Sequence, residues 1–72
     1  MTVFPNPVKD VLSLRTNIRS GNLQIINLQG QVVMACDLMQ VIDVNSLNPG
    51  VYFLKVADAH DKACRFGKFV KE

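Results

Sequence analysis

The feature that most constrains this chain is a series of short apolar runs, separated by turn signals about every ten residues. Within the runs, apolar and polar residues alternate, so that Leu12 and Leu14 share one face and Ser13 the other. No segment of about ten or more residues has helical periodicity, and a single turn over residues 43–47 is the only helical alternative. The pattern therefore predicts an all-β fold.

Seven strands are predicted, and none has a proline in its interior. They span Thr2–Phe4, Val11–Arg15, Leu23–Leu28, Gln31–Asp37, Val41–Val44, Val51–Ala57 and Ala63–Lys71. Seven short antiparallel strands in 72 residues favour a small β-sandwich, with a flattened barrel as the alternative. In the last strand Phe66 and Phe69 fall on opposite faces, and a bulge at Gly67 would bring both into the core.

Three connections have specific turn chemistry. Asn27–Gly30 has Asn first and Gly fourth, which predicts a type I turn closed by a glycine with positive φ, within a hairpin. Asn48–Gly50 places proline and glycine where a type II turn requires them. Pro5–Pro7 lacks two amide donors within three residues, so it is predicted to be a stiff connector and not a strand.

The size and charge of the chain exclude several classes of function. A domain of 72 residues has no room for a deep catalytic cleft with its own supporting shell. A net charge of +2, with the basic residues scattered, is too weak to indicate nucleic acid or an anionic membrane as partner. No apolar run approaches the ~18 residues of a membrane span, and no signal peptide is expected in this chain.

The residues capable of chemistry form no recognisable catalytic or metal site. His60 lies between Asp58 and Asp61 in a polar loop, with Cys64 close in sequence, but the spacing matches no metal motif. Catalysis would also need a nucleophile held against the histidine. The loop is interpreted as a solvated hairpin tip, and no catalytic residue, metal or cofactor is predicted. Cys64 and Cys36 are interpreted as buried free thiols, with a disulfide across the sheets as the alternative.

In the last two strands, the aromatic residues are interpreted as part of the core and the basic residues as part of an exposed edge strand. An exposed aromatic stripe is the alternative, but aromatic residues at strand spacing are more often buried. The core is expected to contain Tyr52, Phe53, Phe66 and Phe69. Lys68, Lys71 and Glu72 are interpreted as part of a solvated edge strand, where lysine discourages unwanted pairing.

The order of motifs is informative beyond the fold. The chain contains Val3–Pro7, Asp10–Leu14, Leu23–Asn27 with Gly30, Ile42–Val44 with Leu47, Gly50–Val56 and Lys68–Lys71. In this order and spacing, residues 3–72 resemble the type A C-terminal sorting domain of type IX secretion substrates from Bacteroidetes. Cys36 and Cys64 are not part of that family's pattern.

The resemblance implies an immunoglobulin-like sandwich over residues 2–72, with Met1 an artificial start and the cargo absent. Such a domain follows its cargo in the chain and is recognised, folded, by the outer-membrane type IX translocon after entering the periplasm. A sortase-like cysteine peptidase then usually removes it, and the cargo reaches the cell surface or the medium. The resemblance implies no catalytic activity, no cofactor, no nucleic acid and no insertion into the membrane.

The same resemblance suggests which residues are recognised. The candidates are Pro5, Asn6, Pro7, Gly30, Gly50, Tyr52, Lys68, Phe69, Val70 and Lys71. The final strand is expected to offer an unpaired edge and two exposed lysines to the translocon. Two other functions stay open at this point. One is a fibronectin III-like module that binds carbohydrate or protein, which exposed aromatic residues would favour. The other is a small enzyme that uses Cys64 and His60.

Overall fold

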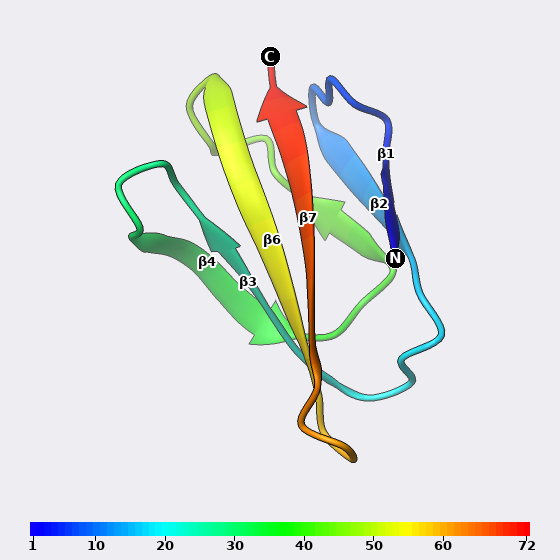
Figure 1. Ribbon diagram of the computed structural model, residues 1–72. Coiled ribbons are helices and arrows are strands. Elements are labelled where there is room, and N and C mark those ends of the chain that lie inside the picture. The colour runs from blue at the N-terminus through cyan, green and yellow to red at the C-terminus, as the bar shows by residue number, and fades with distance from the viewer.

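The computed structural model describes residues 1–72 as seven strands without a helix, and no element could cross a membrane as a helix (Figure 1). All strands predicted from the sequence are present, with ends within two residues of the predicted ones. They are β1 (Thr2–Phe4), β2 (Val11–Arg15), β3 (Gly21–Ile26), β4 (Val32–Asp37), β5 (Val41–Asp43), β6 (Gly50–Asp58) and β7 (Cys64–Lys71).

The strands form two antiparallel sheets, one with the order β1-β2-β5 and the other with the order β4-β3-β6-β7. No strand pairs from one sheet to the other, so the fold is a sandwich and not a flattened barrel. The chain alternates between the sheets as in immunoglobulin-like sandwiches, where strands of two antiparallel sheets are joined by crossing connections. We call the solvent side of the four-stranded sheet its outer face; it carries Phe53, Lys55, Phe66 and Lys68.

The core lies between the two sheets and follows the alternation in the sequence. Leu12 and Leu14 of β2 face Leu23 and Ile25 of β3, as one hydrophobic cluster. The other members of the cluster are Val8, Ile18, Ile42, Val44, Tyr52, Leu54, Val56 and Phe69. Burying every second residue of each strand provides most of the stability of such a small domain, at about 25 cal/mol per Å² of apolar surface.

The β3–β4 hairpin turn confirms the sequence prediction. The Gly30 amide donates to the Asn27 carbonyl at 3.0 Å, and Gly30 has a φ of 84°. The Asn27 side chain also accepts hydrogen bonds from the amides of Gln29 and Gln31, at 3.0 and 2.9 Å. Because Asn27 builds the turn, β3 ends at Ile26 and not at Leu28 as predicted.

The predicted bulge at Gly67 is wrong. Gly67 pairs regularly with Leu54, and the side chains of Met1 and Val3 lie over the place where its own would be. Phe66 therefore stays on the outer face and is 65% exposed. The irregularity lies in the β3–β4 pair instead, where Ile25 pairs with Met34 and Ile26 with Val32, which leaves Val33 as the extra residue.

The connection from β5 to β6 differs from the type II turn that the sequence suggested. Gly50 has a φ of 155°, far from the value of about +80° of a type II turn, and already belongs to β6. The Asn48 carbonyl accepts a hydrogen bond of 2.6 Å from the Tyr52 hydroxyl. A tyrosine at the start of this strand that bonds to the backbone upstream is the tyrosine corner of immunoglobulin-like domains. Residues 43–47 form a turn closed by the Leu47 amide and the Val44 carbonyl, not a helix.

The two cysteines are free, but the sequence interpretation was wrong about their burial. Cys36 is half-buried on β4, and Cys64 is exposed on β7. β4 and β7 are the two edges of one sheet, three strand spacings or roughly 14 Å apart. A disulfide requires Cα atoms within about 7 Å, so the two thiols do not pair within this fold.

Candidate recognition site

Most of the recognition candidates gather at one end of the sandwich, where β6 begins and β7 finishes. We call it the β7 end; it lies at the top of Figure 1. Gly50 pairs with Lys71 there, and Tyr52 pairs with Phe69. The turn of Asn27–Gly30 and the connection of Asn48–Gly50 also meet there, around a shallow hollow of about 280 Å³. Residues from three parts of the chain are thus brought together only by the fold.

Asn6 holds the edge of β7 with its side chain. Its carboxamide oxygen accepts a hydrogen bond from the Val70 amide at 2.9 Å. Its carboxamide nitrogen donates to the Lys68 carbonyl at 3.4 Å. The Asn6 side chain therefore occupies the position that the backbone of an eighth strand would occupy beside β7.

Val8 continues the same edge with its backbone. Its amide donates to the Val70 carbonyl, and the Glu72 amide donates to the Val8 carbonyl, both at 2.8 Å. The Val8 side chain is fully buried. Together, Asn6 and Val8 form what we call the edge clamp. The expectation of an unpaired edge along the final strand is wrong for its last half, because the edge clamp binds these groups.

The two lysines of β7 have different environments. Lys68 is exposed on the outer face, beside Phe53 of β6. Lys71 points inward and is only 7% exposed, and its ammonium donates to the Glu72 carbonyl at 2.8 Å. Burial of a lysine stem with the charge held at its end is a common use of this residue. The expectation of two exposed lysines is therefore confirmed for Lys68 and wrong for Lys71.

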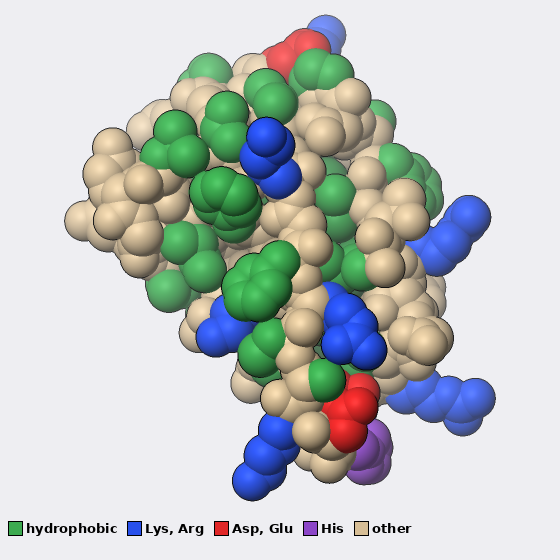
Figure 2. Space-filling view, in the orientation of Figure 1, with side chains coloured by type: hydrophobic (Ala, Val, Ile, Leu, Met, Phe, Trp, Pro, Cys, Tyr) green, Lys and Arg blue, Asp and Glu red, His purple; other side chains and the backbone are tan.

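The four aromatic residues of β6 and β7 divide between the core and the surface. Tyr52 and Phe69 are buried and stack with ring centroids 5.6 Å apart. Phe53 and Phe66 are 38% and 65% exposed, so the expectation that they belong to the core is wrong. Figure 2 shows hydrophobic side chains and lysine or arginine side chains interspersed over the outer face. Val70 is also on this face and is 36% exposed.

The opposite end contains the loop of Asp58–Ala63 and confirms the interpretation as a hairpin tip. Asp58 and Asp61 use their carboxylates to accept hydrogen bonds from the amides of His60 and Ala63, both at 2.8 Å. His60 Nε2 lies 3.2 Å from the Ser20 hydroxyl at the surface. No group of three metal-ligating side chains is present. The acidic residues here shape a turn, and Cys64 is not hydrogen-bonded to His60.

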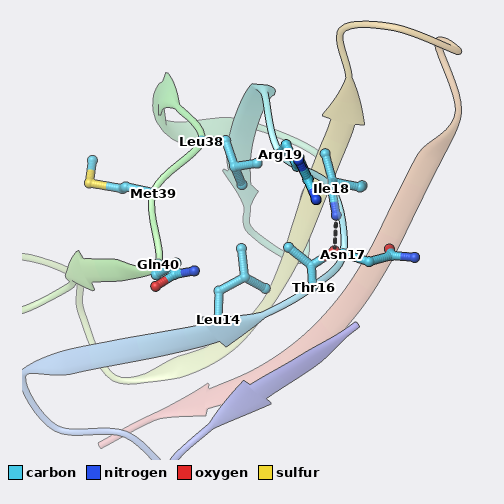
Figure 3. Close-up of a pocket in the computed structure, with 8 residues that line it drawn as sticks. All are labelled: Leu14, Thr16, Asn17, Ile18, Arg19, Leu38, Met39 and Gln40. Atoms are coloured by element: carbon cyan, nitrogen blue, oxygen red, sulfur yellow. Dashed lines mark hydrogen bonds between the residues drawn. The ribbon is translucent and has the colours of Figure 1, made fainter.

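A cleft of about 420 Å³ lies between the Thr16–Arg19 loop and the Leu38–Gln40 connection (Figure 3). Leu14 and Leu38 contribute apolar walls, and the Thr16 hydroxyl accepts a hydrogen bond of 3.2 Å from the Ile18 amide. Arg19 is the one charged residue of the lining. The cleft has no nucleophile beside a base, and it contains none of the recognition candidates.

Sequence reasoning missed the edge clamp and the exposed phenylalanines. A signal existed for Phe53, because Tyr52, Leu54 and Val56 share the inner face, which places Phe53 on the other. No signal existed for Asn6, since its partners are more than sixty residues away in the chain.

A substitution at Asn6 tests the edge clamp. Asn6→Ala removes both side-chain hydrogen bonds and is expected to destabilise the β7 end by about 1 kcal/mol. Amide exchange at Val70 should accelerate about fivefold, the factor that corresponds to this energy. NMR hydrogen exchange measures it, with Asn17→Ala as control, because the exposed Asn17 side chain makes no hydrogen bond within the domain. Equal exchange at Val70 in both variants would show that the clamp contributes nothing.

The geometry defines a small immunoglobulin-like sandwich that presents surfaces and edges. A family model described as secretion system C-terminal sorting domain matches residues 2–72, and the chain belongs to this family. No curated protein matches the chain. No solved structure matches it either. The domain is thus a C-terminal sorting signal for type IX secretion, carried by a cargo protein that is directed to the cell surface or the medium.

Proposed function

We propose that residues 2–72 form a portable, non-catalytic module that the type IX translocon recognises as a folded unit at the β7 end. The observation that carries this proposal is the gathering of the recognition candidates. Asn6, Gly50 and Val70 lie far apart in the sequence but are brought together by the edge clamp and the β6–β7 pairing. A receptor that reads these residues together needs the folded domain, since an unfolded segment would not present them as one surface.

Recognition of the folded domain determines how the cargo reaches the translocon. The folded domain meets the translocon on the periplasmic side of the outer membrane, with the cargo on its N-terminal side. A sortase-like cysteine peptidase then removes the module. The carboxylates of Asp58 and Asp61 accept backbone hydrogen bonds that shape their loop. This structural use of the two acidic residues supports a role in recognition and not in catalysis.

A reporter fusion tests the proposal. Residues 2–72 are fused behind a periplasm-directed reporter in a type IX-competent bacterium, and the reporter is measured in the medium and on the cell surface. Export that depends on the domain and on an intact translocon is expected. The mass of the released reporter shows whether the domain has been removed. If the intact domain never exports the reporter, the proposal fails.

The exposed charge of Lys68 is tested separately. Lys68→Gln is expected to leave the melting temperature unchanged, because exposed lysines contribute little to stability. Export should slow severalfold, since surface charges act mainly on the rate of encounter. Lys62→Gln, at the hairpin tip, is the control and should export normally. Lys71 is unsuitable for this test because it is buried. Normal export of Lys68→Gln would remove Lys68 from the recognised surface.

A further inference from the structure

The outer edge of β4 is the longest edge in the molecule that nothing covers. β4 has six residues and pairs only with β3. The backbone hydrogen bonds outside the strand ladders include none from residues 32–37, and no side chain bonds to their backbone. An edge of this kind presents a row of unpaired amide and carbonyl groups.

The direction of these groups follows from the pairing with β3. The Leu38 amide donates to the Gly21 carbonyl at 3.0 Å, so the backbone groups of Leu38 point toward β3. In an antiparallel strand, the backbone amide and carbonyl of successive residues point alternately to the two sides of the strand. Those of Ala35 and Asp37 therefore point away from β3, toward the open side. Their amides and carbonyls have the spacing that another extended chain would match.

The other edges of the sandwich are shorter or partly covered. The last half of β7 is covered by the edge clamp. β1 and β5 have three residues each, too few to pair with a long strand. β4 contains neither lysine nor proline, the residues that usually discourage pairing along an edge. The fold therefore covers the last half of the β7 edge and leaves the whole edge of β4 accessible.

The side chains beside this edge are apolar and continue across the sheet. Val32 and Val33 are 51% and 41% exposed. Val32 pairs with Ile26, which in turn pairs with Phe53 on β6. A strand added to β4 would extend this apolar row by one position on the outer face. Its amino acids on that side would have to be apolar to bury the exposed valines.

We propose that β4 is the strand-addition site through which a protein of the type IX export machinery binds this domain. The occupant is an extended segment that hydrogen-bonds to Ala35 and Asp37 and alternates apolar residues toward the outer face. The inference rests on the proposed function and adds to the β7 end a separate edge for backbone pairing, because the last half of the β7 edge is already bound by the edge clamp. Backbone pairing also suits a signal that must work with any cargo, since the contacts do not involve the cargo.

Proline at position 35 tests this site. Ala35→Pro removes an amide that points to solvent, and proline is tolerated in edge strands at such positions. Ala35→Thr keeps the amide and is the matched control. Both variants are fused to the exported reporter, and their melting temperatures are measured as isolated domains. Export is expected to fall at least tenfold for Ala35→Pro, with a native-like melt, and to stay normal for Ala35→Thr.

Hydrogen exchange on the wild-type domain provides a second measurement, which does not depend on the folding of a variant. Outer membranes are solubilised in detergent from type IX-competent cells and from cells that lack the translocon. Amides of Ala35 and Asp37 should be protected only by the first extract. Unchanged exchange with both extracts overturns the proposal, even if Ala35→Pro fails to fold.

The remaining outcomes separate the two proposals. If Ala35→Pro folds and exports at the wild-type rate, β4 is not the docking edge, while the sorting function stands. If the wild-type domain exports no reporter, the proposed function itself fails. If sedimentation shows a wild-type dimer that Ala35→Pro dissociates without loss of export, β4 binds a second copy of this chain, and the proposal of an export partner is wrong.

Discussion

Replacing Phe69 with alanine is expected to destabilise the domain by about 3–5 kcal/mol, the usual cost of truncating a buried phenylalanine. Phe69 is fully buried and stacks on Tyr52. A domain of this length has a total stability on the order of 4–11 kcal/mol. The substitution therefore removes a large part of the free energy of unfolding, and the reporter fused to this variant should fail to be exported.

Phe66→Ala is the matched control for this prediction. Phe66 is three residues away on the same strand but is 65% exposed on the outer face. Its truncation should change the free energy of unfolding by less than about 0.5 kcal/mol. Denaturant unfolding followed by circular dichroism measures both variants. Similar losses in the two would contradict the assignment of Phe69 to the core and Phe66 to the surface.

Gly21→Ala is expected to cost about 2–4 kcal/mol and to lower the melting temperature by roughly 10–25 °C. A Cβ at Gly21 would overlap the carbonyl oxygen of Ala57, with which β3 pairs at this end. Because the obstacle is backbone, it cannot rotate away. The start of β3 would have to separate from β6 to admit the methyl group.

Gly30→Ala separates this effect from the general loss of a glycine. Gly30 has a φ of 84°, and a Cβ there meets nothing within 4 Å. Its cost should be limited to the conformational penalty, about 1 kcal/mol. Thermal melts of the two variants make the comparison. A Gly21→Ala variant as stable as Gly30→Ala would show that β3 and β6 are less closely packed at Gly21 than described.

The strands could be predicted from the sequence because their signals are local. Alternation placed Leu12, Leu54 and Val56 in the core, and the chemistry of Asn27 and Gly30 predicted their turn. Features that depend on distant residues could not be read in this way. Gly67 suggested a bulge by its position between two phenylalanines, but its partners are Met1 and Val3, at the other end of the sequence.

The candidate recognition site shows the same division. The motif around Asn6 was identified, but its hydrogen bonds to β7 required the tertiary structure. Lysine in an alternating strand usually indicates solvent, and Lys71 departs from this rule because it lies at the margin of the core, opposite Gly50, which has no side chain. The open edge of β4 is a property of sheet order, which no local pattern encodes.

The edge clamp also has a consequence for when the domain can fold. Asn6 and Val70 are 64 residues apart, so their contact closes a loop almost as long as the domain. Contacts of this kind form slowly, and folds dominated by them need milliseconds to seconds. The β7 end cannot be completed until Val70 has been synthesised and released. A chain truncated before Val70 would lack the complete β7 end. If export requires the β7 end, only chains that have been translated past Val70 would be exported.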